Sequence, residues 1–175
     1  QEVIRKLEEG ASESDDEVQV LVSEINEQCS ELMEYVYSRS LSQLKNGKLV
    51  GILGGDHSTP FGLMKALAET QGEYGILQID AHADLRNAYE GFTYSHASIM
   101  TNALSLQNVT KLVSVGVRDI CDQEVATIEN SAKRIVAFYD EELKFKEFNG
   151  INWNTVCDEI VTELPQKVYI SFDID

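Results

Sequence analysis

Apolar and polar residues repeat along the chain with two different periods, which predict where helices and strands lie. Within residues 18–36 the apolar positions recur at steps of three and four, the period of one buried helix face. Ser14, followed three residues later by Glu17, has the pattern of a helix capping box, and the Asn-Gly pair at 46–47 ends the helical pattern. We therefore expect residues 1–47 to be mainly an N-terminal helix.

After this region the pattern changes to short apolar runs separated by helical segments. Apolar runs of this length that end in glycine or acidic residues are typical of buried strands. The expected strands lie at 49–53, 74–79, 112–117, 135–139 and 168–172, and the expected helices at 60–69, 122–132 and 154–164. This alternation predicts an α/β fold, a three-layer α/β/α sandwich with a mainly parallel sheet, in which residues 48–175 complete a single domain, 1–175.

The composition is that of a folded acidic protein. The 175 residues include 30 Asp and Glu against 14 Lys and Arg, a formal net charge of −16, and 43% are apolar. This apolar fraction is sufficient for a core and argues against disorder. Because phosphate binding depends on Lys and Arg, the charge argues against nucleic acid or an anionic membrane as partner and favours a cationic small molecule.

The cysteines and the hydropathy bear on the cellular compartment. Cys29, Cys121 and Cys157 lie far apart and form no CxxC pair, which argues against a disulfide framework and against a thiolate zinc site. No apolar run approaches the roughly 20 residues that span a bilayer. We therefore expect a cytoplasmic protein that does not associate with a membrane.

Metal-binding residue types follow three of the expected strands. These segments are Gly-Gly-Asp-His-Ser at 54–58, Asp-Ala-His-Ala-Asp at 80–84 and Ser-Phe-Asp-Ile-Asp at 171–175. In open α/β sheets ligands bind beyond the carboxyl ends of the strands, so we expect the three segments to meet at one edge. Crowded carboxylates raise one another's pKa, and a multivalent cation relieves this conflict.

The candidate metal ligands are His57, Asp80, His82, Asp84, Asp173 and Asp175. Alternate residues of an extended segment point the same way, so the acids and the histidine of 80–84 can face one cavity, as can the two acids at 173 and 175. Oxygen-rich ligation with few imidazoles suits Mn²⁺, and less readily Mg²⁺ or Zn²⁺. Two ions about 3.5–4 Å apart that share carboxylates can activate water for hydrolysis.

Three further residues each have two interpretations. His96, in Tyr-Ser-His at 94–96, is of the residue type best suited to donate a proton to a leaving amine near pH 7, although its position alone is ambiguous. Asp56 either caps the helix that follows or orients His57 by accepting a hydrogen bond. Arg86 is either a salt-bridge partner of a local acid or a residue of the site.

Taken together, these segments resemble the signature segments of the ureohydrolase family of arginases and agmatinases, and they occur in the family's order. Tyr-Ser-His at 94–96 and Gly-Val-Arg at 116–118 also resemble family segments, so the likeness covers about residues 49–175. It implies two Mn²⁺ per subunit and a role for His96 in proton transfer or substrate contact. The implied ligands are His57, Asp80, Asp84 and Asp173 for one ion and Asp80, His82, Asp173 and Asp175 for the other, with Asp80 and Asp173 bridging.

The resemblance also implies a reaction, the hydrolysis of a guanidino carbon to urea and an amine. Residues 84–87 and 94–97 look more like agmatinases than arginases. The expected substrate is therefore agmatine, which gives urea and putrescine for polyamine biosynthesis. Arginase, guanidinobutyrase and formimidoylglutamase activities of the same family stay open, as do a mononuclear zinc deacetylase on a related fold and a non-catalytic homologue that binds a metabolite or partner.

Family members continue past the last aspartate of this sequence. The resemblance implies a later segment with a Glu that contacts the guanidinium, and further elements that complete the sheet and the interface of a homo-oligomer. We therefore expect the 175 residues to be an incomplete arginase-like catalytic domain, truncated at the C-terminus, and a doubtful catalyst in isolation.

Overall fold

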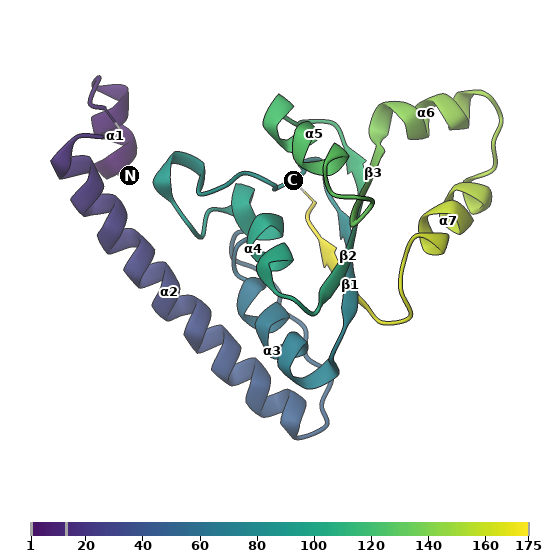
Figure 1. Cartoon of the computed structure of the whole chain (residues 1–175), viewed down its shortest axis with the longest axis horizontal. Helices are drawn as coiled ribbons and strands as arrows, with labels where there is room; N and C mark the ends of the chain where they lie inside the picture. Colours follow the sequence, from purple (N-terminus) through teal and green to yellow (C-terminus); the bar gives the residue numbers. More distant parts are fainter. Residues whose placement is uncertain (1, 13, 175) are drawn as a thin grey trace.

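The computed structural model describes residues 2–12 and 14–174, which form helix, sheet and helix layers (Figure 1). In this part of the chain the sheet has four parallel strands in the order β3-β2-β1-β4. The strands are β1 (Tyr74–Ile79), β2 (Val109–Val117), β3 (Ile135–Tyr139) and β4 (Val168–Phe172). The helices are α1 (Glu2–Glu8), α2 (Asp16–Lys45), α3 (Phe61–Gln71), α4 (Ile99–Ser105), α5 (Asp122–Glu129), α6 (Asp140–Phe148) and α7 (Trp153–Thr162), with short 3₁₀ turns η1 (Tyr89–Gly91) and η2 (His96–Ser98).

Both faces of the central strands are covered, which explains their nearly continuous apolar sequences. Ile76 of β1 and Leu112 of β2 pack with α3 and α4 on one face. The next residue of β2, Val113, points to the opposite face and packs with Leu143 of α6 and Val156 of α7. Figure 1 shows these helix pairs on opposite sides of the sheet. The three-layer arrangement expected from the sequence is therefore confirmed.

One expected strand, at 49–53, is not formed. The segment is irregular, and the side chains of Leu49 and Leu53 are fully exposed. An apolar run becomes a buried strand only when a neighbouring strand completes its hydrogen-bond ladder. Among the described residues no strand pairs with this segment, so the prediction of a fifth strand is wrong for this structure. The other expected strands are present, and β2 begins three residues earlier than expected.

The start of the long helix also differs from expectation. Asp15 is the residue that precedes α2, and the capping box expected at Ser14 and Glu17 does not form. The Ser14 hydroxyl instead lies 2.8 Å from that of Ser12, while Glu17 accepts a hydrogen bond from Lys6 of α1 at 2.6 Å. The two side chains expected to form the capping box, Ser14 and Glu17, thus contact the preceding segment instead. None of the described helices, α2 included, combines the length and apolar character needed to cross a membrane.

The packing of α3 on α2 depends on a glycine, which gives a test of this contact. A Cβ atom at Gly62 would lie 2.7 Å from the Met33 carbonyl oxygen and 2.7 Å from the Tyr37 backbone nitrogen. Because backbone atoms cannot move aside as a flexible side chain can, Gly62→Ala is expected to destabilise the fold by about 1–3 kcal/mol in urea unfolding. Gly51→Ala is the matched control, since a Cβ there meets nothing within 4 Å. Equal stabilities of the two variants would contradict this view of the helix contact.

Candidate metal centre

The carboxyl ends of two neighbouring strands and one preceding turn build the site. Asp80 follows β1 and Asp173 follows β4. The register pairs Ile79 with Phe172, and the Asp173 backbone N–H donates to the Ile79 carbonyl at 3.0 Å, so the two aspartates leave the sheet side by side. His57 comes from the turn before α3. The three segments expected from the sequence to meet at one edge of the sheet do so in the described residues.

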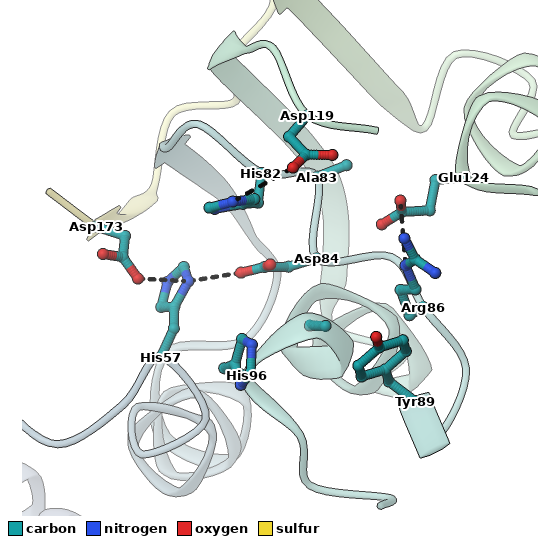
Figure 2. A pocket seen from close by; sticks show the side chains of 11 residues that line it. His57, His82, Ala83, Asp84, Arg86, Tyr89, His96, Asp119, Glu124 and Asp173 are labelled. Atoms are coloured by element: carbon teal, nitrogen blue, oxygen red, sulfur yellow. Dashed lines mark hydrogen bonds and ion pairs between the residues drawn. The ribbon is translucent and has the colours of Figure 1, made fainter. Parts of the chain in front are cut away.

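His57 lies at the centre of this group. Its Nδ1 atom is 2.7 Å from Asp84 Oδ2, 3.1 Å from Asp80 Oδ2 and 3.4 Å from Asp173 Oδ2. Its Nε2 atom lies 2.7 Å from the Ser171 hydroxyl, which fixes the orientation of the ring. Figure 2 shows the imidazole between Asp84 and Asp173. Three carboxylates therefore converge on one ring nitrogen.

The pKa values express this excess of negative charge. Burial alone would lower the pKa of His57, but the hydrogen bonds and charges of Asp80 and Asp84 outweigh it and raise the pKa to about 10. Burial would raise the pKa of Asp80, but hydrogen bonds from His57, the His82 backbone N–H and Gln78 hold it below its usual value. Burial, together with the charge of Asp80, raises the pKa of Asp84. The cluster is thus an environment that stabilises a positive charge.

The donor set fits a divalent cation. His57, Asp80 and Asp173 each offer one ligand atom, and these atoms lie within 4.8 Å of one another. One imidazole nitrogen with carboxylate oxygens suits Mn²⁺ and related ions, whereas no thiolate is part of this group. Asp84 adds a further buried carboxylate beside the same nitrogen.

His82 lies farther from this group, and Asp175 lies outside the described residues. The His82 side chain is 44% exposed, compared with 7% for His57. Its Nδ1 atom is 3.5 Å from Asp80 Oδ1, and its Nε2 atom is 4.0 Å from Asp119 Oδ2. Asp80 therefore contacts one imidazole on each side.

Glu124 was not foreseen, and it supports the loop after Asp84. Asp84 has a left-handed backbone, with φ of 54°. The next residue, Leu85, donates its N–H to Glu124 Oε1 at 2.9 Å. Arg86 Nε lies 3.7 Å from Glu124 Oε2, and the Arg86 guanidinium lies 5.1 Å from the centre of the Tyr89 ring. Arg86 is thus both the salt-bridge partner of a local acid and a residue lining the cavity, as Figure 2 shows.

His96 faces the same cavity, which has a volume of about 220 Å³. It begins η2, next to Ser95, whose hydroxyl accepts a hydrogen bond from the Ala97 N–H. The cavity wall also includes His57, His82, Asp84, Asp119, Glu124 and Asp173. The Asp56 carboxylate lies in the turn before α3, where it accepts hydrogen bonds from the Ser58 N–H and hydroxyl.

Gln78 is a second residue that was not foreseen. Its side chain is fully buried in β1 and hydrogen-bonds to Asp80 Oδ2 at 3.0 Å. The sequence signal for Gln78 is its amide side chain within an otherwise apolar strand, two residues before the candidate ligand Asp80. The sequence signal for Glu124 is weaker: it is an acid three residues after Cys121, the spacing of a helix capping box, which it completes at the start of α5.

Comparison with known proteins identifies the family. The model of the arginase family matches residues 6–175, almost the whole chain. The chain belongs to the arginase family. It is 36% identical over 140 residues to the N(1)-aminopropylagmatine ureohydrolase of Thermus thermophilus, covering 80% of this chain and 44% of that protein. It is 34% identical over 131 residues to the formimidoylglutamase of Halalkalibacterium halodurans, covering 71% of this chain and 39% of that protein.

A solved structure of a related protein has the same fold as this chain. The agmatine ureohydrolase of Thermoplasma volcanium superposes with a TM-score of 0.68 at 25% identity, covering 84% of this chain and 46% of that one. The resemblance to ureohydrolases inferred from the motifs is therefore confirmed, as is the arginase-like fold. The chain spans less than half the length of these relatives.

Proposed function

We propose that this protein is a binuclear manganese hydrolase that cleaves a guanidino C–N bond to give urea and an amine. The observation that carries the proposal is the convergence of Asp80, Asp84 and Asp173 on His57, in a cavity that His96 also lines. The second ion would add His82 and Asp175 to the shared Asp80 and Asp173. Bound divalent ions supply charge that polarises a substrate and lowers the pKa of water.

A cationic substrate fits the charge of the cavity. Its wall carries the acids Asp84, Asp119, Glu124 and Asp173, and its one lining Arg or Lys among the described residues, Arg86, is paired with Glu124. Bound ions would neutralise Asp84 and Asp173, so Asp119, whose side chain is 76% exposed, is the acid of this wall that would stabilise a guanidinium. The names of the relatives, aminopropylagmatine ureohydrolase and agmatine ureohydrolase, support agmatine or an aminopropyl derivative as substrate.

Different residues of this chain would bind the metal ions and transfer the proton. Asp80, Asp84 and Asp173 would hold the ions, and the Ser171 and Gln78 contacts keep His57 and Asp80 oriented. His96, which also lines the cavity, would give its proton to the leaving amine nitrogen as the C–N bond breaks. This division assigns binding and proton transfer to different side chains.

We also propose a cytoplasmic homo-oligomer that acts in polyamine biosynthesis. The three cysteines are free, which supports a reducing compartment. Phe148 and Trp153, on α6 and α7, are large and exposed, which supports a protein interface there.

The test is product release by the intact protein loaded with Mn²⁺. We expect urea from agmatine or N(1)-aminopropylagmatine at rates above those from arginine and guanidinobutyrate, and about two manganese ions per chain by elemental analysis. Formimidoylglutamate belongs in the panel with formamide as its product. No product from any of these compounds would overturn the proposal, and a single tightly held zinc would favour the mononuclear alternative.

A further inference from the structure

Gln78 is a fully buried polar side chain that contacts the candidate metal centre. It lies within β1 and has no exposed surface, and its partner Ser114 on β2 is 2% exposed. The two residues are directly paired across the parallel strands. A buried amide is costly unless its hydrogen bonds are made, so its partners must account for its presence in this apolar strand.

The partners fix which way the amide points. Gln78 Nε2 lies 3.0 Å from Asp80 Oδ2 and 3.2 Å from the His82 backbone carbonyl. An ionised carboxylate and a carbonyl can only accept hydrogen bonds, so the amide nitrogen must face both and use its two hydrogens on them. The amide oxygen then faces Ser114, whose hydroxyl donates to it at 2.8 Å. Ser114 therefore satisfies the amide oxygen, while the two acceptors on the other side oppose a 180° flip.

This arrangement restrains two candidate ligands with one side chain. Asp80 Oδ2 is held by Gln78, and Asp80 Oδ1 accepts the His82 N–H at 2.8 Å. Gln78 also holds the carbonyl of His82. Gln78 and the His82 N–H thus each engage one Asp80 oxygen, and Oδ2 also faces His57 Nδ1 at 3.1 Å, so a cation between these two atoms would contact both.

We propose that Gln78, whose amide oxygen is satisfied by Ser114, is a positioning residue that presents Asp80 and His82 to the metal ions and thereby raises the affinity of the site for Mn²⁺. The proposal rests on the metal centre of the proposed function. It adds a buried amide and a hydroxyl, which touch neither the ions nor the substrate, to the determinants of metal binding. Partners of this kind typically contribute 10- to 100-fold in metal affinity.

A set of three variants separates positioning from packing. Gln78→Met keeps the approximate volume and removes both N–H donors, but it leaves the Ser114 hydroxyl without its acceptor. Gln78→Met with Ser114→Ala removes that hydroxyl too, and replacing both partners by apolar groups is far less destabilising than orphaning one. Ser114→Ala alone keeps both donors to Asp80 and His82. The double variant therefore recovers the part of the stability lost to the orphaned Ser114 hydroxyl, while Asp80 and the His82 carbonyl lack the amide donors in both variants.

The measurements are Mn²⁺ affinity by titration calorimetry and urea unfolding of the metal-free protein. We expect Mn²⁺ affinity to fall about 10- to 100-fold in both variants that carry Gln78→Met, and by less than about tenfold in Ser114→Ala. Stability should recover in the double variant while affinity does not. If affinity recovers together with stability, the role of Gln78 is packing alone and the proposal is overturned. If the unmutated protein binds no Mn²⁺, the metal centre itself is overturned, and the positioning role with it.

Discussion

Asp80→Asn is expected to remove both Mn²⁺ binding and urea release. Asp80 is the carboxylate that contacts both His57 and His82, and its side chain is 1% exposed. The substitution removes one negative charge from the centre of the cluster. It also places an amide where two donors, Gln78 Nε2 and the His82 N–H, now require acceptors. Loss of a shared ligand should exceed the 10- to 100-fold effect of a supporting residue, so we expect more than about 100-fold weaker Mn²⁺ binding.

The comparison variant is Asp158→Asn, which makes the same chemical change at an exposed position of α7. It should bind Mn²⁺ and release urea as the unmutated protein does. Both proteins are titrated with Mn²⁺ in the absence of substrate and then assayed with agmatine. Mn²⁺ affinity within about tenfold of normal in Asp80→Asn, below the range for even a supporting residue, would contradict the assignment of Asp80 as a central ligand.

The sequence correctly predicts those elements whose formation depends mainly on the residues of their own segment. β1, β3 and β4 have the expected bounds because each is a short apolar run whose hydrogen bonds a neighbouring strand completes. Of the three, β1 is buried, whereas most side chains of the edge strand β4 are exposed. The segment 49–53 has the same pattern, yet its state depends on a pairing partner elsewhere in the chain. The start of α2 shows the same limit, since Lys6 of α1 takes the Glu17 side chain that local spacing assigns to a capping box.

The same distinction applies to the candidate site, where the ligands are predicted and the residues that support them are not. The meeting of Asp80 and Asp173 follows from one rule, that ligands gather at the carboxyl ends of parallel strands, whereas His57 joins them from the turn before α3 without the strand expected at 49–53. Glu124 could not be found in this way, because its contact with Leu85 joins residues 39 positions apart. Gln78 needs Ser114 of the neighbouring strand to satisfy its buried amide oxygen, and the pairing of those two strands cannot be predicted from either segment alone. Sequence spacing thus predicts the candidate ligands. The residues that support them, such as Gln78 and Glu124, are recognised only from contacts between distant segments.

His96→Asn is expected to separate catalysis from metal binding. His96 lines the cavity, but the group of ligand atoms that lie within 4.8 Å of one another consists of those of His57, Asp80 and Asp173. Mn²⁺ affinity should therefore stay within about threefold of normal, well below the effect of removing a ligand's supporting partner. Removing a general acid typically costs 10²- to 10⁴-fold, and we expect a fall in kcat of about that size with agmatine.

The leaving group provides the control for this interpretation of His96. A basic alkylamine needs a proton as the C–N bond breaks, whereas a guanidino analogue with an arylamine leaving group needs it much less. His96→Asn should therefore slow agmatine more than the aryl analogue, and the ratio of the two kcat values should change by about tenfold or more, because general acid catalysis depends on proton transfer to the leaving atom. Equal slowing of both substrates would mean that His96 contacts or orients the substrate and that the proton comes from another group in the cavity.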